Sequence, residues 1–164
     1  MSQVTFFLEL PPYLEQWYRN RCGGESPIQP LRGSHESDII EEFITTLPVG
    51  QQPQLQPKEG EVAIAIPSFR SKPPLYYNFM PPEAKNALKA SIKLEFDIDL
   101  WNSLRKFTDK GSPLKELIFA YMEKHGIAAS ETNFLAISKA YQRKRECHIK
   151  AQQKREMRKS KKTK

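Results

Sequence analysis

The feature that most constrains the fold is the point at which the last helical pattern loses its apolar face. Phe134, Ile137 and Tyr141 recur at the i, i+3 and i+7 spacing of one helix face, and polar or basic residues dominate after them. A segment without an apolar face cannot be packed into a core. We therefore predict one compact domain over residues 1–141 and a basic helical extension over residues 142–164, which frays in its last six residues, 159–164.

Charge divides the chain near the same place. Residues 138–164 contain 12 Lys or Arg and 2 acidic residues, which gives a net charge of +10. Residues 1–137 contain 14 Lys or Arg and 17 acidic residues, which gives a net charge of −3. Together they give the +7 of the whole chain. A basic arm on an acidic body is typical of polyanion binding. We predict a nucleic-acid partner, DNA rather than RNA, and self-association or a protein partner through the acidic body.

The first half of the chain combines two strand patterns with two helix patterns. Residues 4–10 and 61–66 are rich in β-forming residues, so we expect them to pair, although the sequence leaves the direction open. A helix follows Pro11-Pro12, with an apolar face of Leu14, Trp17 and Tyr18, and it ends at Gly23-Gly24. A second helix, capped by Ser37 or Ser34, has the apolar stripe Ile39, Ile40, Phe43, Ile44 and Leu47. Residues 48–60 have the Gln, Pro and Gly content of a linker.

The second half is predicted to be helical. A helix begins at Pro81-Pro82, and Asp97 or Asp99 is predicted to cap a separate helix over residues 97–110. Ser112 caps the next helix, over residues 113–126, whose end is marked by Gly126. Ser130 or Thr132 caps the last helix, whose docked part covers residues 131–145. The fold class is therefore α+β, mostly α, with a small two-stranded β element and five or six helices.

The three helices predicted between residues 97 and 146 resemble helix-turn-helix DNA-binding domains, and more loosely the homeodomain-like variant. The resemblance rests on three successive helices, of which the last is apolar at first and cationic afterwards. It implies that the last helix enters the major groove of DNA. The candidate nucleic-acid-binding residues are Asn133, Ser138, Gln142, Arg143, Lys144, Arg145, Lys150, Lys154, Arg155 and Arg158.

A second basic segment lies in the first half of the chain. Arg70 and Lys72 stand among aromatic residues in the Pro-rich stretch 68–82, where cations and rings together can bind single-stranded nucleic acid. The alternative is an extended loop whose rings pack on the core. Arg70 and Lys72 are therefore secondary candidates.

The sequence shows no catalytic pattern. Glu59, Glu61 and Lys72 could be forced into a metal-dependent nuclease site, but without a recognisable spacing. Cys22 and Cys147 match no zinc site, so we expect no metal, no cofactor and no enzyme activity. Reduced cysteines and the absence of an 18-residue apolar run favour a cytoplasmic protein without a membrane partner.

The function predicted from these features is non-enzymatic nucleic-acid binding. The protein would be a regulator of transcription, or an accessory factor in replication, recombination or a mobile element. The alternative is an interaction or assembly protein whose basic arm docks on an acidic partner.

Overall fold

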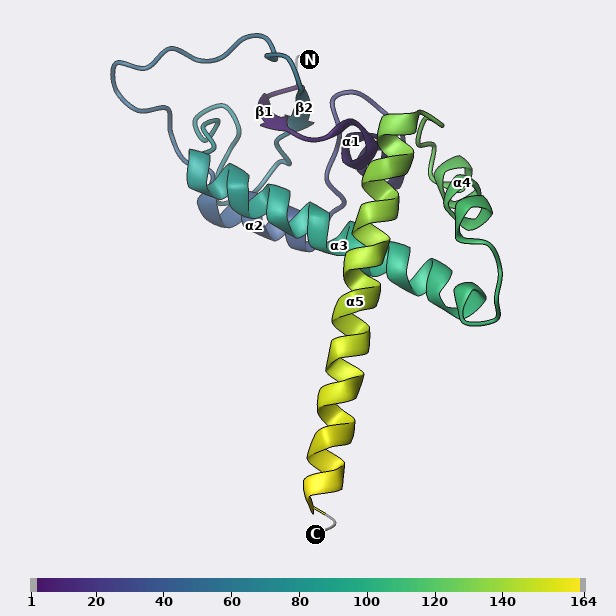
Figure 1. Cartoon of the computed structure of the whole chain (residues 1–164). Coiled ribbons are helices and arrows are strands. Elements are labelled where there is room, and N and C mark those ends of the chain that lie inside the picture. Colours follow the sequence, from purple (N-terminus) through teal and green to yellow (C-terminus); the bar gives the residue numbers. More distant parts are fainter. Residues whose placement is uncertain (1–2, 163–164) are drawn as a thin grey trace. The chain divides into compact units, whose positions relative to one another are not determined.

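The computed structural model describes residues 3–162 (Figure 1). Within that range the elements are β1 (Thr5–Glu9), α1 (Pro12–Arg21), α2 (His35–Phe43), β2 (Glu61–Ala65), α3 (Pro82–Thr108), α4 (Leu114–Lys124) and α5 (Glu131–Lys162). Five helices and one two-stranded sheet confirm the predicted α+β, mostly α, class. Residues 48–60 form a long loop without helix or strand, as predicted.

The two strands pair with each other, and the direction is antiparallel. Thr5 lies opposite Ala65 and Glu9 opposite Glu61. The edge of β2 that faces away from β1 is bonded to Ile28, which forms an isolated parallel bridge with Ile64. The predicted pairing of the two strand segments is therefore confirmed.

The chain divides into two compact units within α3. The first runs to Phe96 and includes His125–Ile127, and the second comprises Asp97–Lys124 and the residues from Ala128 onward. One cooperative domain over residues 1–141 stays a prediction.

The core of the first unit is built around aromatic rings. Phe96 is fully buried, and its ring meets Tyr13 and Trp17 edge-on, with centroid distances of 5.2 and 5.5 Å. Edge-to-face contacts of this kind add to the free energy gained from burying the rings. Leu14 from α1 and Ile40 from α2 are also buried.

The second unit is packed around one face of α5. Ile137 is fully buried and Tyr141 almost so. The Tyr141 hydroxyl is 2.7 Å from Oγ1 of Thr108, at the end of α3. The Tyr121 hydroxyl of α4 donates a hydrogen bond of 2.6 Å to Oδ2 of Asp99. These polar contacts tie α4 and α5 to the second half of α3.

The prediction of a separate helix beginning at Asp97 or Asp99 is wrong, because α3 is continuous from Pro82 to Thr108. The buried residues Phe96, Leu100 and Leu104 continue the four-residue spacing of the first half of the helix without interruption. The acidic residues that suggested a cap lie inside the helix, where Asp99 accepts the bond from Tyr121.

The predicted apolar stripe of the second helix is partly wrong. α2 ends at Phe43, whose side chain is 50% exposed, and Ile44 is already extended. Two contacts distant in sequence end the helix: Lys72 Nζ donates to the carbonyl oxygens of Glu41 and Glu42, at 2.6 and 2.8 Å. Thr45 then forms a bridge with Phe79. The N-terminal cap is Ser34, one of the two predicted, whose hydroxyl accepts from the backbone N–H of Ser37.

The last helix is longer than its predicted docked part, and it does not fray where predicted. α5 runs from Glu131 to Lys162, so residues 159–162 are helical, and residues 163–164 lie outside the described part of the chain.

An acidic pair in the first unit should make stability depend on pH. Glu36 is buried and accepts from Ser91 Oγ at 3.1 Å, while Glu95 is paired with Arg21 at 2.8 Å. Burial first, and then repulsion by Glu36, raise the pKa of Glu95 above its ordinary value of 4.5.

Because the folded-state pKa of Glu95 is raised, its protonated form favours folding, and this contribution is lost as the pH rises above about 4.5. We expect the free energy of unfolding of the wild type, relative to Glu95→Gln, to decrease from pH 4.5 upward and then level off. Urea unfolding of both proteins across this range measures the difference. A difference that is constant with pH would contradict the assignment.

Candidate nucleic-acid interface

α5 is the element that holds the predicted interface, and its N-terminal turns are fixed by a cap. Ser130 Oγ accepts from the backbone N–H of Asn133 at 3.2 Å, so the serine is the cap, as one of the two alternatives predicted. From there the helix continues for 32 residues, about 48 Å at 1.5 Å per residue. Its C-terminal half extends beyond the other elements of its unit (Figure 1).

Asn133 is not available to bind a nucleic acid, contrary to the prediction. Its side chain is only 3% exposed, and its Nδ2 donates to the carbonyl oxygen of Ala128 at 3.0 Å. The residue therefore holds the turn before α5 to the first turn of the helix. A side chain buried in this way cannot reach a base edge in a groove.

The docked side of α5 extends past Tyr141. The Trp101 ring of α3 lies 5.6 Å from the Tyr141 ring and 5.1 Å from the His148 ring, measured between centroids. Lys144, on the same side of the helix, is half-buried. The part of α5 that leaves the unit therefore begins after His148.

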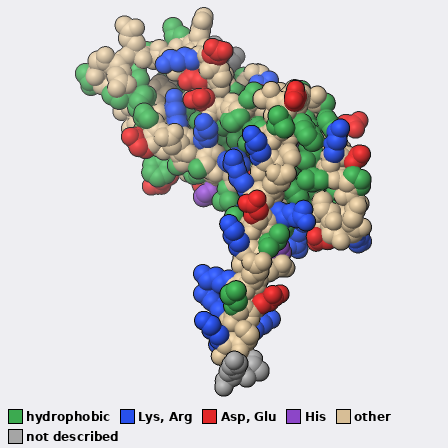
Figure 2. Space-filling model, in the orientation of Figure 1, with side chains coloured by type: hydrophobic (Ala, Val, Ile, Leu, Met, Phe, Trp, Pro, Cys, Tyr) green, Lys and Arg blue, Asp and Glu red, His purple; other side chains and the backbone are tan. Residues whose placement is uncertain are grey.

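The basic residues in the C-terminal part of α5, from Arg143 onward, lie mainly on one half of the helix. At about 100° per residue, nine of the ten Lys or Arg between residues 143 and 162 fall within one half of the circumference. Arg145 is the exception, and it shares the opposite half with Glu146 and Glu156. Figure 2 shows Lys and Arg side chains gathered along this part of the molecule. The nine define the cationic face: Arg143, Lys144, Lys150, Lys154, Arg155, Arg158, Lys159, Lys161 and Lys162.

The cationic face has two rows with a seam between them. One row lies within about 20° of Arg143, and the other lies about 100–160° further round. The first row consists of Arg143, Lys150, Lys154 and Lys161. The second row consists of Lys144, Arg155, Lys159 and Lys162. The seam contains the short side chains of Cys147 and Ala151, followed by Arg158, and all three are exposed.

The structure brings together six of the ten predicted interface residues. Arg143, Lys144, Lys150, Lys154, Arg155 and Arg158 share the cationic face. Ser138, Gln142 and Arg145 lie on the other half of the helix, and Asn133 is buried. Lys159, Lys161 and Lys162 were missed because their segment was expected to fray. The signal that could have found them was helical spacing, because Lys159 follows Arg155 by four residues, and Lys161 and Lys162 follow Lys154 and Arg155 by seven.

The secondary candidates lie in the first unit and differ from each other. Lys72 is held by the two carbonyl oxygens at the end of α2, at 2.6 and 2.8 Å, whereas Arg70 is exposed. Tyr76 is 65% exposed, and Phe69 and Tyr77 are half-buried. Lys72 therefore has a structural role in ending a helix, and only Arg70 and Tyr76 are open to a ligand.

Glu61, considered for metal-dependent chemistry, is instead held by the loop before β2. Its Oε2 accepts from Gln54 Nε2 at 2.6 Å and from the backbone N–H of Lys58 at 2.8 Å. Burial opposes the change, but these hydrogen bonds, together with the nearby charges of Lys85 and Lys58, outweigh it, and the pKa of Glu61 is lowered. Among residues 3–162, no group of three or more His, Cys, Asp or Glu could hold a metal ion.

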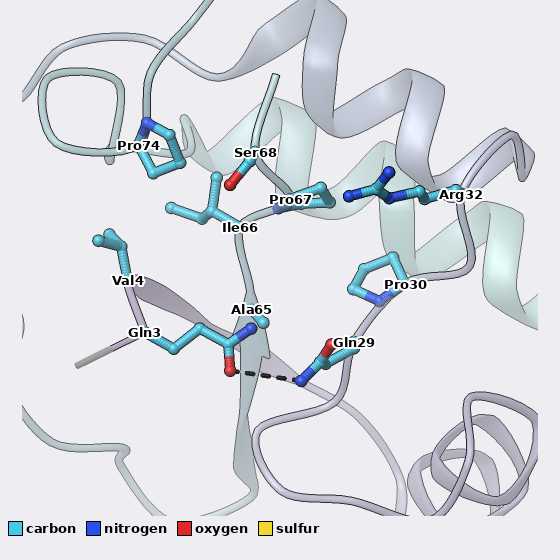
Figure 3. A pocket seen from close by; sticks show the side chains of 10 residues that line it. All are labelled: Gln3, Val4, Gln29, Pro30, Arg32, Ala65, Ile66, Pro67, Ser68 and Pro74. Atoms are coloured by element: carbon cyan, nitrogen blue, oxygen red, sulfur yellow. Dashed lines mark hydrogen bonds between the residues drawn. The ribbon is translucent and has the colours of Figure 1, made fainter. Parts of the chain in front are cut away.

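A pocket of about 340 Å³ lies beside the end of β2 in the first unit (Figure 3). Gln29 Nε2 donates to Gln3 Oε1 at 3.5 Å across its floor, and the guanidinium of Arg32 lies beside Pro67. Arg32 is the one charged residue among the described residues that line it.

Comparison of the chain with protein-family models, curated proteins and solved structures gives no match. None of the helices within residues 3–162 is both long and apolar enough to cross a membrane. The chemistry of the described residues is therefore the basis for any functional argument.

Proposed function

We propose that the protein is a non-enzymatic nucleic-acid-binding protein whose cationic face on α5 binds duplex DNA. The observation that carries this proposal is the position of nine Lys or Arg on one half of a single helix, with both acidic residues of that stretch on the other half. A helix that was basic only to remain soluble would gain nothing from this separation.

Release of counterions supplies the affinity. Each phosphate neutralised on B-DNA lowers the logarithm of the binding constant by about 0.9 per tenfold increase in salt. The two rows hold four cations each, and rows on opposite flanks of a helix suit the phosphates on opposite walls of a groove. The expected dependence on salt is therefore steep.

The dimensions of α5 favour DNA over RNA. A helix with its side chains is about 10–12 Å across, and the major groove of B-DNA is about 12 Å wide. The major groove of duplex RNA is too deep and narrow for such an element. Cys147 and Ala151 keep the seam low, so that the helix backbone can approach the base edges while the two rows reach the phosphates.

Fluorescence anisotropy tests the proposal. The probes are a random-sequence DNA duplex, an RNA duplex of the same sequence and one of the DNA strands alone, each titrated at several salt concentrations. We expect tightest binding to duplex DNA and a steep loss with salt. Preference for the single strand would move the contact to Arg70 and Tyr76. No binding to any of the three at low salt would overturn nucleic-acid binding and favour an acidic protein partner for α5.

The two free cysteines allow the bound face to be located. Cys147 lies exposed in the seam, whereas Cys22 is half-buried in the first unit, where burial raises its pKa. We expect saturating duplex DNA to slow alkylation of Cys147 by iodoacetamide about tenfold or more, since a covered thiol cannot react, and to leave Cys22 unchanged. Peptide mass spectrometry reads both rates in one sample. Equal rates at Cys147 with and without bound DNA would show that the seam faces away from it.

The biological role proposed with this activity is that of a regulator of transcription or an accessory factor acting on DNA. Phosphate contacts of the two rows give affinity and position but little choice of sequence. Arg158 is the one seam residue that can make a bidentate contact to guanine.

A further inference from the structure

We propose that the outer edge of β1 binds an extended, acidic peptide segment of a partner protein, which adds to the sheet as a third strand. This site lies wholly in the first unit and is independent of the function proposed for α5. Strand addition needs a row of backbone donors and acceptors without partners, and a groove wide enough to admit another chain.

The hydrogen-bond pattern shows which groups point outward. The backbone N–H of Ile66 donates to Val4 O at 2.9 Å, and that of Leu10 donates to Gly60 O at 3.2 Å. In an antiparallel pair the residues that bond across the ladder alternate, so even-numbered residues of β1 face β2. The N–H and C=O groups of Thr5, Phe7 and Glu9 therefore point to the other side.

This outer edge is unpaired, whereas the corresponding edge of β2 is not. The backbone of Ile28 donates to Ala63 O at 2.9 Å and accepts from Ala65 N–H at 2.8 Å. In the part of the chain that the structure describes, β1 is hydrogen-bonded to β2 alone. The edge from Thr5 to Glu9 is about 13 Å long at 3.3 Å per residue, enough for a short strand.

A groove of about 440 Å³ runs along the start of this edge. One wall is β1, and the other is formed by residues 51–55 of the loop and residues 78–80. The loop is anchored rather than loose, because Gln54 Nε2 and the Lys58 N–H both bond to Glu61 Oε2, at 2.6 and 2.8 Å. Leu55, on the groove wall, is 84% exposed. The groove is thus formed before any strand enters it.

The lining indicates the chemistry of the occupant. Apart from β1 itself, the groove is lined by apolar side chains, by amides and by one charged residue, Lys85. Lys85 already lies close enough to Glu61 to help lower the pKa of that carboxyl, so it attracts carboxylates at this place. An acidic strand with alternating apolar side chains fits both features, and the cationic α5 tail of a second copy does not.

The test uses the full chain, labelled with ¹⁵N, and a panel of synthetic peptides of about seven residues. In the panel, Val or Leu alternates with Glu, Lys or Ser. We expect the Glu peptides to slow the hydrogen exchange of the Thr5 and Phe7 amides about tenfold or more, since a new strand would bond to N–H groups that have no partner strand, and the Lys peptides to have no effect. Lys85→Ala should reduce the preference for Glu over Lys.

Methylation of the peptide nitrogens separates strand addition from simple electrostatic binding. Methyl groups on one alternate set of amides should abolish binding, and those on the other set should not, because only one set faces the β1 edge. Equal effects of both sets, or unchanged exchange at Thr5 and Phe7 with every peptide at about 1 mM, would overturn the proposal. Neither outcome bears on DNA binding by α5.

A variant of the protein gives a second reading. Thr5→Pro removes an outward N–H, a change that edge strands tolerate, and should weaken the Glu peptides about fivefold or more. Because proline in β1 can also disturb the sheet, the amide spectrum of residues 61–65 reports whether β2 stays paired. If Thr5→Pro keeps that spectrum and binds the Glu peptides as tightly as the wild type, the edge is not the site.

Discussion

Replacing Arg143, Lys150, Lys154 and Arg158 by alanine is expected to weaken binding to duplex DNA by about 100-fold or more at 0.15 M salt, if each contacts a phosphate. Three of the four form one row and the fourth lies in the seam, and all are exposed. The slope of log K against log salt should fall by about 3 to 4, at about 0.9 per lost contact. Anisotropy titrations at four salt concentrations measure both quantities.

The matched control is the pair Arg143→Ala and Arg145→Ala. Both residues are exposed on the same turn of α5, but only Arg143 belongs to the cationic face. We expect Arg143→Ala to lower affinity and Arg145→Ala to have at most a small effect. Equal effects of the two would mean that only the net charge of the helix matters, and that the arrangement in rows has no role.

The same variants separate DNA binding from docking on an acidic protein. Counterion release depends on the condensed ions of a nucleic acid, so its salt slope is set by the number of phosphates contacted. An acidic protein surface lacks that dense ion atmosphere, and its attraction is screened over about 8–10 Å at moderate salt. A slope that does not change when four cations are removed would therefore argue against phosphate contacts.

The elements that the sequence predicted well are those with local signals. The Pro-Pro start of α3 and the Ser130 cap of α5 depend on residues within one turn of the helix. The strand pairing was predictable because residues 4–10 and 61–66 were the strongest β patterns in the chain. Its antiparallel direction could not be predicted, since the long segment between the strands permits either.

The errors have two different physical origins. The end of α2 depends on Lys72, about thirty residues away, whose ammonium group bonds to the carbonyl oxygens of the last turn. No local pattern contains that contact. The continuity of α3 was present in the sequence, because Leu100 and Leu104 extend the four-residue stripe, but acidic residues that resembled a cap concealed it.

In the candidate interface, too, some features have a local signal in the sequence and others do not. The basic residues and their placement on two neighbouring sides of the helix follow from the spacing in the sequence, but the continuation of both rows to Lys161 and Lys162 depends on the helix extending to Lys162. Asn133 stands three residues after Ser130, the position whose backbone N–H a capping serine binds. That spacing was a local signal that the asparagine belongs to the cap and not to the interface.

Phe96→Ala is expected to lower the free energy of unfolding by about 3–5 kcal/mol, the usual cost of truncating a buried aromatic residue. Phe96 is fully buried between the rings of Tyr13 and Trp17, so the substitution removes two edge-to-face contacts and leaves a cavity. For a chain of this size we expect Tm to fall by about 6–20 °C. Thermal unfolding monitored by circular dichroism measures this shift.

The control is Phe43→Ala, the same substitution at a side chain that is 50% exposed. We expect it to change the free energy of unfolding by less than about 1 kcal/mol, because little apolar surface returns to water. A comparable loss at both positions would mean that residues around Phe43 are covered in solution, by another copy of the chain for example. A small effect of Phe96→Ala would show that the ring cluster does not form the core of the first unit.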